Sequence, residues 1–358
     1  MPAKQAVVHV GPDPCDIGGM SSVICALVQT ADYTADSLVS WRPKARFKGV
    51  LIAVRAALKI MGPLRRTRPL ILHFHLSERG SWCREGLLLV LAKKNGYQTA
   101  ITLHGADFVS WTSAPWPAKL VRYVLQHADD VFALHEFDQT LVRRLAPLSA
   151  VTLISNPVPR QELPFPDEKE GLRVLFLGEM SLRKGLDVLV EAWPSIAQAT
   201  GATLAIAGPS HDVDVEVATL VGVTIVGSVP MAAAQLLIRS ADVIVLPSRA
   251  EALPMVLIEA MALQVPWVST AIAGIPRLAI SGGGIVVTPG SAAELGKAVT
   301  ALLLDADKRR AMGLAGRSWY LANATPEAVH LVLSSSYSLS AQRNSNRRAS
   351  QKMQGDQR

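Results

Sequence analysis

The chain has 358 residues, of which 49% are hydrophobic and 18% charged, so it is a well-packed globular protein and not a disordered one. Its length exceeds one ordinary core and suits two domains. The formal charge is +7, but the tail 341–358 alone holds five basic residues and one acid. No basic stripe marks a folded segment, which argues against a nucleic-acid partner.

Cysteine use and hydropathy bear on the compartment. The cysteines Cys15, Cys25 and Cys83 have neither metal nor disulfide spacing, and so sparse a set fits a reducing compartment. The N-terminus enters a predicted strand without a signal peptide. No apolar run reaches the roughly 18 to 20 residues that span a bilayer. We therefore expect a cytoplasmic protein.

Short buried strands alternate with helical patterns through the first half. Strands are predicted at 6–10, 70–75, 97–104 and 130–134. Helices are predicted near 20–30, 47–61, 83–95, 116–127 and 137–145. The strands are rich in leucine and β-branched residues with little polar alternation, as buried parallel strands are. This order predicts a parallel sheet with helices on both faces.

A linker with four prolines is expected at 156–171, after which the same pattern begins again. Strands are predicted at 172–178, 202–208, 223–227, 242–247, 265–270 and 284–289, and helices near 186–199, 231–239, 254–264, 292–304 and 306–340. The expected domains are 1–160 and 171–320, then a helix at 321–340 packing back on the first domain, and a disordered basic tail at 341–358. Two doubly wound halves would bind their ligand in the cleft between them.

Two glutamates, Glu251 and Glu259, flank the start of the predicted helix near 254–264. Pro254 suits its first helical position. A helix N-terminus presents free amides and a positive dipole end, which suits an anion such as a diphosphate. Glu259 would then lie near the hydroxyls of an adjoining sugar, with Glu251 on the other side. A surface acid and a dipole-complementing acid would explain an isolated pair, but the surrounding sequence favours the ligand.

The stretch "VLPSRAEALPMVLIEAMALQVPWVSTAIAGIP" resembles the signature of the retaining, nucleotide-sugar-dependent glycosyltransferases of the large family-four group. "LFLGEMSLRKGLDVLVEAW" resembles the family's other signature, and "HVGPDPCDIGGMSSVICAL" and "ITLHGADF" resemble its first half. The resemblance covers nearly the whole chain before the tail. It implies the α/β GT-B fold, with two Rossmann-like doubly wound parallel-sheet domains facing a central cleft.

The resemblance implies a role for each residue of the second-half signatures. Glu259 would bind the nucleotide ribose, and Glu251 would lie beside the donor sugar as a catalytic residue. The backbone amides of Met255 and Val256 would face the diphosphate. Lys184 would contact the same diphosphate, where a fixed cation stabilises the charge on the leaving group.

The first half supplies further candidates. The loop with Gly18 and Gly19 would border the donor diphosphate, because glycines allow a close backbone approach. His104, at the carboxyl end of a predicted strand, would contact the donor sugar and take part in catalysis. His75 and Asp107 would lie on the acceptor side. For each histidine, a packed side chain at a strand end is an equal alternative.

The sequence departs from the family at Glu179, where an arginine usually serves as a second phosphate cation. We expect Arg183 to supply that charge. Gln264 replaces the usual helix-ending glycine, which we expect to matter for structure alone. Asp212 and Asp214 are interpreted as a solvated turn. We therefore expect no metal, and no cofactor besides the nucleoside diphosphate sugar that serves as donor substrate.

The segment 46–66 is helical, apolar and basic. It fits a crossover helix that buries its apolar face on the sheet, which is the favoured interpretation. It also fits a helix lying on an anionic membrane surface, and such contact would place the protein peripherally on the inner face of the plasma membrane.

The resemblance thus implies a retaining glycosyltransferase that moves a sugar from a nucleoside diphosphate to a hydroxyl of a glycan or polyprenyl-linked acceptor, in surface polysaccharide biosynthesis. Two alternatives stay open. One is a nucleotide-sugar epimerase on the same fold. The other is a non-catalytic protein that binds sugar nucleotides.

Overall fold

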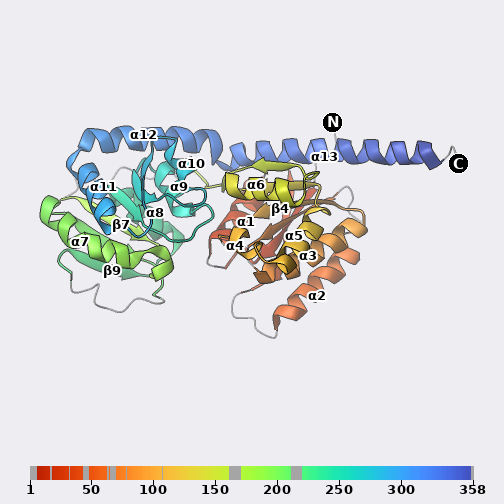
Figure 1. The fold of residues 1–358 in the computed structure, drawn as a ribbon, viewed down its shortest axis with the longest axis horizontal. Helices are drawn as coiled ribbons and strands as arrows, with labels where there is room; N and C mark the ends of the chain where they lie inside the picture. Colours follow the sequence, from red (N-terminus) through yellow and green to blue (C-terminus); the bar gives the residue numbers. More distant parts are fainter. Residues whose placement is uncertain are drawn as a thin grey trace. The chain divides into compact units, whose positions relative to one another are not determined.

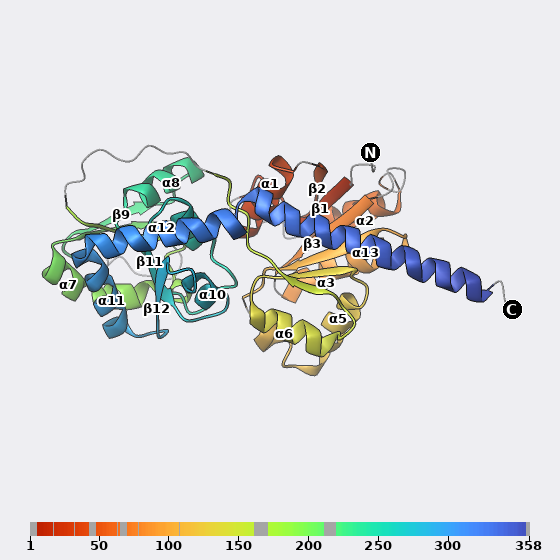
Figure 2. The ribbon, with the colours of Figure 1, turned by 90° about the horizontal axis from the view of Figure 1, so that it is seen from above.

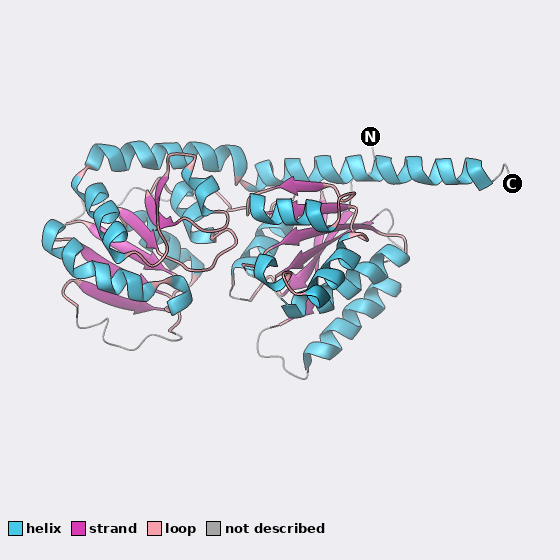
Figure 3. Cartoon of the chain, viewed as in Figure 1, coloured by secondary structure: helices cyan, strands magenta, loops and turns pink. Residues whose placement is uncertain are grey.

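A computed structural model describes the chain as two compact units. The described residues are 6–16, 18–31, 33–42, 48–62, 64, 70–77, 79–106, 108–160, 171–210 and 220–355. Unit 1 comprises Met1–Pro157 and Pro326–Arg358, and unit 2 comprises Val158–Thr325. In each unit helices cover a parallel sheet (Figures 1 and 3), which confirms the predicted pair of doubly wound α/β sheets.

The sheet of unit 1 has the strand order β2-β1-β3-β4-β5-β6 among the described residues. Its strands are β1 (Ala6–Pro12), β2 (Thr34–Trp41), β3 (Leu70–Leu76), β4 (Gln98–Leu103), β5 (Asp130–Ala133) and β6 (Val151–Leu153). Its helices are α1 (Gly19–Gln29), α2 (Lys48–Met61), α3 (Arg79–Lys94), α4 (Phe108–Trp111), α5 (Pro115–Leu125), α6 (Glu136–Leu145) and α13 (Pro326–Gly355). Every residue of the central strand β3 is buried, as expected of a parallel strand covered on both faces.

Two strands of this sheet have no counterpart in the sequence prediction. β2 lies at the edge of the sheet, and exposed polar residues such as Thr34 and Asp36 interrupt its sequence TADSLVSW. β6 is three residues long and forms the opposite edge. An edge strand needs less apolar sequence than a central one, so neither segment gives a strong hydrophobic signal.

Helix α13 packs along unit 1, as Figure 2 shows from above. Its His330 lies within hydrogen-bond distance of Tyr33, with 2.9 Å between His Nδ1 and the phenol oxygen. Further along, the hydroxyl of Ser340 donates to the Asp130 carboxylate. The helix continues to Gly355, so the expectation of disorder from residue 341 is wrong for 341–355. Since no proline or glycine stands between Pro326 and Gly355, nothing in the sequence breaks the helix earlier.

The sheet of unit 2 has the strand order β12-β11-β10-β7-β8-β9 among the described residues. Its strands are β7 (Arg173–Leu177), β8 (Thr203–Ala207), β9 (Val223–Gly227), β10 (Val243–Leu246), β11 (Trp267–Thr270) and β12 (Gly284–Val287). Its helices are α7 (Leu186–Thr200), α8 (Met231–Ser240), α9 (Met255–Ala262), α10 (Ile275–Ala279), α11 (Ala292–Leu304) and α12 (Ala306–Asn323), with a 3-10 turn η2 at Leu182–Lys184. The neighbours β7 and β10 end beside each other, which positions the loops that follow them.

The expected linker falls largely on 161–170, which lie outside the described residues. Just before it, the Val158 amide donates to the Ala324 carbonyl at 2.9 Å, and the Tyr320 hydroxyl donates to the Val158 carbonyl. These bonds join both ends of unit 2. Within the described part of the chain, no helix combines the length and the apolar character that crossing a bilayer would require.

Candidate functional site

The loop after β10 and the turn η2 bring two predicted site residues into direct contact. The Lys184 ammonium lies 2.5 Å from Oε1 of Glu251, and the Ser248 hydroxyl donates to the same oxygen at 2.8 Å. Glu251 is only 8% exposed. A carboxylate this buried requires such partners, because an unpaired buried charge is costly. Lys184 and Glu251 therefore form one charged unit.

Local backbone geometry fixes Lys184 in this place. The Ser181 hydroxyl caps η2 by accepting from the Lys184 amide at 3.4 Å. The next residue, Gly185, has φ +71°, and a Cβ there would lie 1.9 Å from the Pro247 carbonyl oxygen. Only glycine therefore lets η2 approach the end of β10 so closely. The same glycine also begins α7 as its N-cap residue.

Arg249 connects the loop after β10 to the turn η2 and the start of α7, and the sequence prediction did not include this residue. Its guanidinium makes two 2.6 Å hydrogen bonds to the Asp187 carboxylate, and it also donates to the Leu182 carbonyl. Its backbone amide donates to the Arg183 carbonyl at 2.8 Å. Hydrogen bonding to Arg249 lowers the pKa of Asp187, so this pair stays ionised. The only sign of Arg249 that the sequence offered was its position as a basic residue two places before Glu251.

The helix α9 begins beside this pair, at Met255. Pro254 is its N-cap residue, so the expectation that Pro254 takes the first helical position is wrong by one residue. No side chain caps this end, and the Leu257 amide bonds back to the Pro254 carbonyl at 3.3 Å. The amides of Met255 and Val256 lie in the first turn, where a helix has no acceptor of its own to offer. They meet the requirement for an anion site.

Glu259 lies one turn further along α9 and is 9% exposed. Burial raises the pKa of its carboxyl from 4.5 to about 7. Within the described residues it has no hydrogen-bond or ion-pair partner, unlike Glu251. A nearly buried, unpartnered carboxyl inside an apolar helix suits a ligand that supplies hydroxyl donors.

Arg183 does not stand as a free cation. Its guanidinium is 3.1 Å from Oε2 of Glu179, and it also donates to the Ala250 carbonyl at 3.3 Å. Glu179 is the residue found where the family usually has an arginine. The two opposite charges offset each other. Arg183 therefore contributes less positive charge than was expected of it as a replacement for the arginine missing at position 179. Of the described cationic side chains in these loops, Lys184 is the one that contacts Glu251.

In unit 1, Gly18 and Gly19 lie exposed at the start of α1. The Gly18 carbonyl accepts from the Ser22 amide at 3.0 Å, which begins the helix. A Cβ added at Gly18 would meet nothing within 4 Å, so packing alone does not require a glycine there. Asp107, the other acceptor-side candidate, lies outside the described residues, as do Asp212 and Asp214 of the predicted turn.

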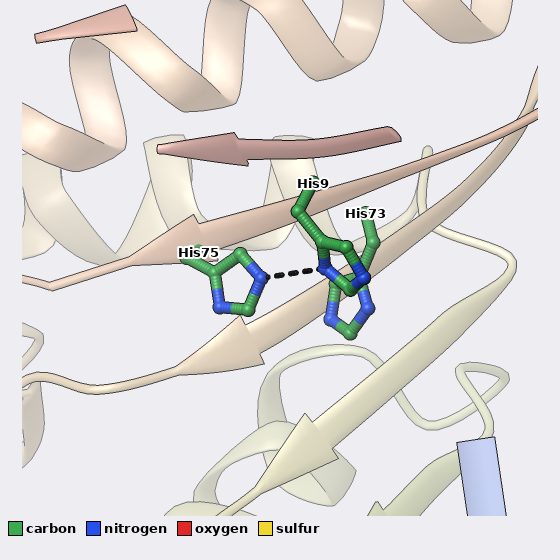
Figure 4. Close-up of side chains that lie close together, drawn as sticks. All are labelled: His9, His73 and His75. Carbon is green, nitrogen blue, oxygen red and sulfur yellow. Dashed lines mark hydrogen bonds between the residues drawn. The ribbon is translucent and has the colours of Figure 1, made fainter. Parts of the chain in front are cut away.

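His75 belongs to a cluster of histidines with His9 and His73 (Figure 4), and His104 is hydrogen-bonded to it. His9 Nδ1 lies 3.0 Å from His75 Nε2, and His75 Nδ1 lies 3.0 Å from His104 Nε2. Both His9 and His75 are fully buried in neighbouring strands, β1 and β3. His104 follows β4, and its amide donates to the Leu76 carbonyl. The two predicted histidines, His75 and His104, are therefore joined in one hydrogen-bonded chain. The chain also includes His9, which the sequence prediction did not name.

Burial lowers the pKa of His9 to about 3 and that of His104 to about 4, and also lowers the pKa of His75. All three rings are therefore neutral near pH 7, with one N–H each. The bonds must then run in a single direction along the chain. His9 Nε2 is buried without a partner, and a bare acceptor is tolerated better than an orphaned N–H. We infer that His9 donates to His75, His75 donates to His104, and His104 carries its proton on Nδ1.

His73 completes the cluster, and nitrogens of His9, His73 and His75 lie within 4.8 Å of one another. However, His73 already uses both nitrogens, at 2.6 Å from the Tyr337 hydroxyl and 2.7 Å from the Thr102 hydroxyl. Its ring stacks on that of His75 with 15° between the planes, so the two rings do not converge on one point. A shared metal would have to break these bonds. The cluster fits a hydrogen-bonded network better than a metal site.

Sequence comparison shows what the second unit resembles. Residues 171–305 match the family model described as "Glycosyl transferases group 1". The matched range contains the predicted second-half site residues, Lys184, Glu251 and Glu259.

Individual relatives extend the likeness to the first half. A Bacillus subtilis protein named for teichuronic acid biosynthesis, as a glycosyltransferase, is 26% identical over 68% of this chain, and the match spans 64% of its own length. The glycogen synthase of Mycobacterium tuberculosis is 25% identical over 81% of this chain and 73% of its own.

Solved structures share the fold of the whole chain. Sucrose-phosphate synthase from Thermosynechococcus elongatus superposes with a TM-score of 0.75 at 19% identity, covering 94% of this chain and 99% of that one. Anabaena HepE, crystallised with UDP and glucose, gives 0.68 at 14% identity, covering 93% and 99%. The doubly wound sheets, the family match and these likenesses agree. Residues 171–305 thus match the glycosyl transferases of group 1, and the chain as a whole has the GT-B fold.

Proposed function

We propose that the protein transfers a sugar, with retention of anomeric configuration, from a nucleoside diphosphate to a hydroxyl of a glycan or polyprenyl-linked acceptor. The single observation that carries this is the arrangement in unit 2. The paired Lys184 and Glu251 lie in the loops that meet before the uncapped start of α9, and the unpartnered Glu259 lies within that helix. An ammonium, free amides and a second carboxyl within the same helix are what a nucleoside diphosphate requires.

Each residue has a distinct part in this proposal. The first-turn amides of α9, with Met255 and Val256, bind the diphosphate, and Lys184 stabilises the charge that develops on it as the sugar leaves. Glu259 accepts hydrogen bonds from the ribose. Glu251 lies on the sugar side of the diphosphate, where it pairs with Lys184 and contacts the transferred sugar.

For unit 1, the proposal follows the resemblance. Gly18 and Gly19 border the diphosphate, His104 contacts the donor sugar, and His75 holds His104 in one tautomer. His9, on β1, belongs to the same hydrogen-bonded chain and acts through His75.

Relatives support the choice of substrate class. The proteins named in the comparisons include the UDP and glucose complex of HepE and a Staphylococcus aureus TarM complex with UDP and α-GlcNAc-glycerol. By analogy, a UDP-sugar is the first donor to test, and a surface polysaccharide is the first acceptor class. The B. subtilis relative named for teichuronic acid biosynthesis points to the same kind of acceptor.

A stepwise assay tests the proposal. The protein is first screened for thermal stabilisation by UDP, GDP and ADP, and then incubated with the corresponding sugar nucleotide and a hydroxyl acceptor. We expect a product whose anomeric configuration, read by NMR, matches that of the donor. We also expect activity to survive EDTA, since the proposal assigns no step to a metal.

The assay also separates the two alternatives. An epimerase would convert the free donor without any acceptor. A non-catalytic binding protein would be stabilised by the nucleotide and form no product. Failure of every nucleoside diphosphate to stabilise the protein would contradict all three readings.

A further inference from the structure

Helix α2 exposes an apolar side in addition to the one it buries. Its inward-facing residues Ala56 and Ile60 are buried in unit 1. Its large apolar residues point outward instead: Val50 is 69% exposed and Leu58 is 57% exposed, and Leu51, Val54 and Met61 are exposed as well. A crossover helix needs only its buried side to hold the sheet. The exposed apolar side therefore has no role in the fold of unit 1.

These outward residues form one stripe, which the neighbouring helix extends. At 3.6 residues per turn, Val50, Val54, Leu58 and Met61 follow one another along the same side of α2. Helix α3 lies beside α2 (Figure 1), and its Leu87 is 63% exposed. A groove of about 1100 Å³ runs between the two helices, lined by residues that include Trp41, Val50, Val54, Arg84 and Leu87.

The described charges that border this stripe on α2 have one sign. Arg55 and Lys59, both exposed, follow the adjacent side of α2, and the sequence of α2 contains no acid. Two acids near the groove, among the residues that the structure describes, are paired with arginines. Asp13 pairs with Arg42, and buried Glu85 accepts from Arg84 at 2.6 Å. The surface made by α2, Trp41 and Leu87, here called the α2–α3 face, is therefore apolar at its centre and basic at its border.

We propose that the α2–α3 face docks on an anionic lipid bilayer. A helix lying in a membrane interface buries an apolar stripe among the acyl chains while its basic side chains meet the phosphate head groups. Trp41, whose ring lies 5.6 Å from the Arg84 guanidinium, supplies the aromatic residue that favours this interface. The proposal does not depend on which sugar nucleotide unit 2 binds.

Charge decides between this occupant and a second copy of the chain. A two-fold dimer through the α2–α3 face would bring the Arg55 and Lys59 of one copy toward those of the other. No acid on α2 offsets that repulsion. An anionic bilayer complements both the apolar stripe and the basic border.

The test is flotation of the full-length protein with phosphatidylcholine vesicles, made with or without phosphatidylglycerol. We expect binding to the anionic vesicles that weakens with added salt, and little binding to the neutral ones. The triple variant Val50→Ser, Val54→Ser, Leu58→Ser and the double variant Arg55→Glu, Lys59→Glu should each lose about tenfold or more of this binding. Because all five side chains are exposed, both variants should fold and keep the wild-type melting temperature.

Matched controls lie elsewhere on the surface. Leu148 and Ile280 are exposed apolar residues outside the α2–α3 face, so Leu148→Ser and Ile280→Ser should bind vesicles like the wild type. Equal binding to neutral and anionic vesicles, or full binding by folded stripe variants, would overturn the proposal. A dimer seen by light scattering, dissolved by the stripe variants and without vesicle binding, would assign the face to a second copy and also overturn it.

Discussion

The Lys184 ammonium lies 2.5 Å from the Glu251 carboxylate, although 67 residues separate them along the chain. The same carboxylate oxygen also accepts from Ser248. The cation proposed to bind the diphosphate is therefore held by an acid before any ligand arrives. A diphosphate must compete with Glu251 for Lys184, so the pair couples nucleotide binding to the state of the proposed catalytic glutamate.

This coupling predicts opposite effects of two substitutions on nucleoside diphosphate binding. Lys184→Ala removes the cation and should weaken binding by about tenfold or more. Glu251→Gln removes the competing charge and should tighten binding of the sugar-free nucleotide by about tenfold, while it lowers turnover. Titration calorimetry measures both, and the double variant should bind like Lys184→Ala alone. Weaker binding by Glu251→Gln would show that the glutamate orients the lysine and does not compete for it.

Glu259 predicts a pH dependence of stability. Its pKa is about 7 in the folded protein against 4.5 in the reference state. As pH rises from 4.5, the unfolded chain loses this proton first, so unfolding becomes easier until the folded carboxyl also ionises near pH 7. Relative to Glu259→Gln, the wild type should therefore lose roughly 3 kcal/mol or less over that window and nothing further above it. Denaturant unfolding of both proteins at several pH values measures the difference, and a constant difference would contradict the raised pKa.

Glu179 predicts a gain of affinity. It now pairs with Arg183 at 3.1 Å, and both groups are partly exposed. Glu179→Gln leaves Arg183 its positive charge without the opposing acid, so nucleoside diphosphate affinity should rise several-fold at low salt, less at high salt. Arg183→Ala in the wild-type background should lower affinity, because it leaves the negative charge of Glu179 unopposed. If Glu179→Gln leaves affinity unchanged by calorimetry, Arg183 does not reach the diphosphate.

The histidine chain predicts a tautomer. With His9 donating to His75 and His75 to His104, the His104 proton lies on Nδ1. Nitrogen NMR shifts of labelled protein near pH 7 should show neutral His104 protonated on Nδ1. His75→Phe removes the donor to His104 Nε2, so the two tautomers of His104 should then coexist and turnover should fall with little change in nucleotide affinity. An Nε2-protonated His104 in the wild type would reverse the direction of the chain.

The sequence predicted the central strands because burial on both faces leaves continuous apolar runs such as that of β3. It missed β2, whose polar residues at the sheet edge hide the strand pattern. It also ended the helical part too early, since α13 continues into a polar, basic segment. That segment lacks the apolar periodicity by which a helix is recognised, even though nothing in it breaks a helix.

The site was predicted in parts, and its pairings were not. Lys184 and Glu251 each belong to a local motif that can be read from neighbouring residues. Their contact depends on β7 lying next to β10, and strand order in a doubly wound sheet is not encoded locally. The pairings of Arg249 with Asp187 and of Arg183 with Glu179 follow from the same loops. Gln264 shows the opposite case: with φ 60° it ends α9 in the left-handed conformation, as expected where the family has glycine.

Gly185 predicts a large and specific loss of stability. A Cβ at this position would meet the Pro247 carbonyl oxygen at 1.9 Å, and φ is +71°. Gly201 has a similar φ of +66° with nothing within 4 Å of its Cβ position. Gly201→Ala should therefore cost about 1 kcal/mol for its backbone conformation alone, whereas Gly185→Ala should cost several kcal/mol more because η2 must move away from β10.

The two alanine variants form a matched pair, since both remove a glycine next to the same helix, α7. Thermal unfolding measures their stability, and nucleotide titration measures whether the Lys184 position survives. We expect Gly185→Ala to lose nucleotide affinity even where it remains folded, because Lys184 directly precedes the strained residue. Equal melting temperatures for the two variants would mean that the contact between η2 and Pro247 relaxes freely, and that Lys184 is not held by it.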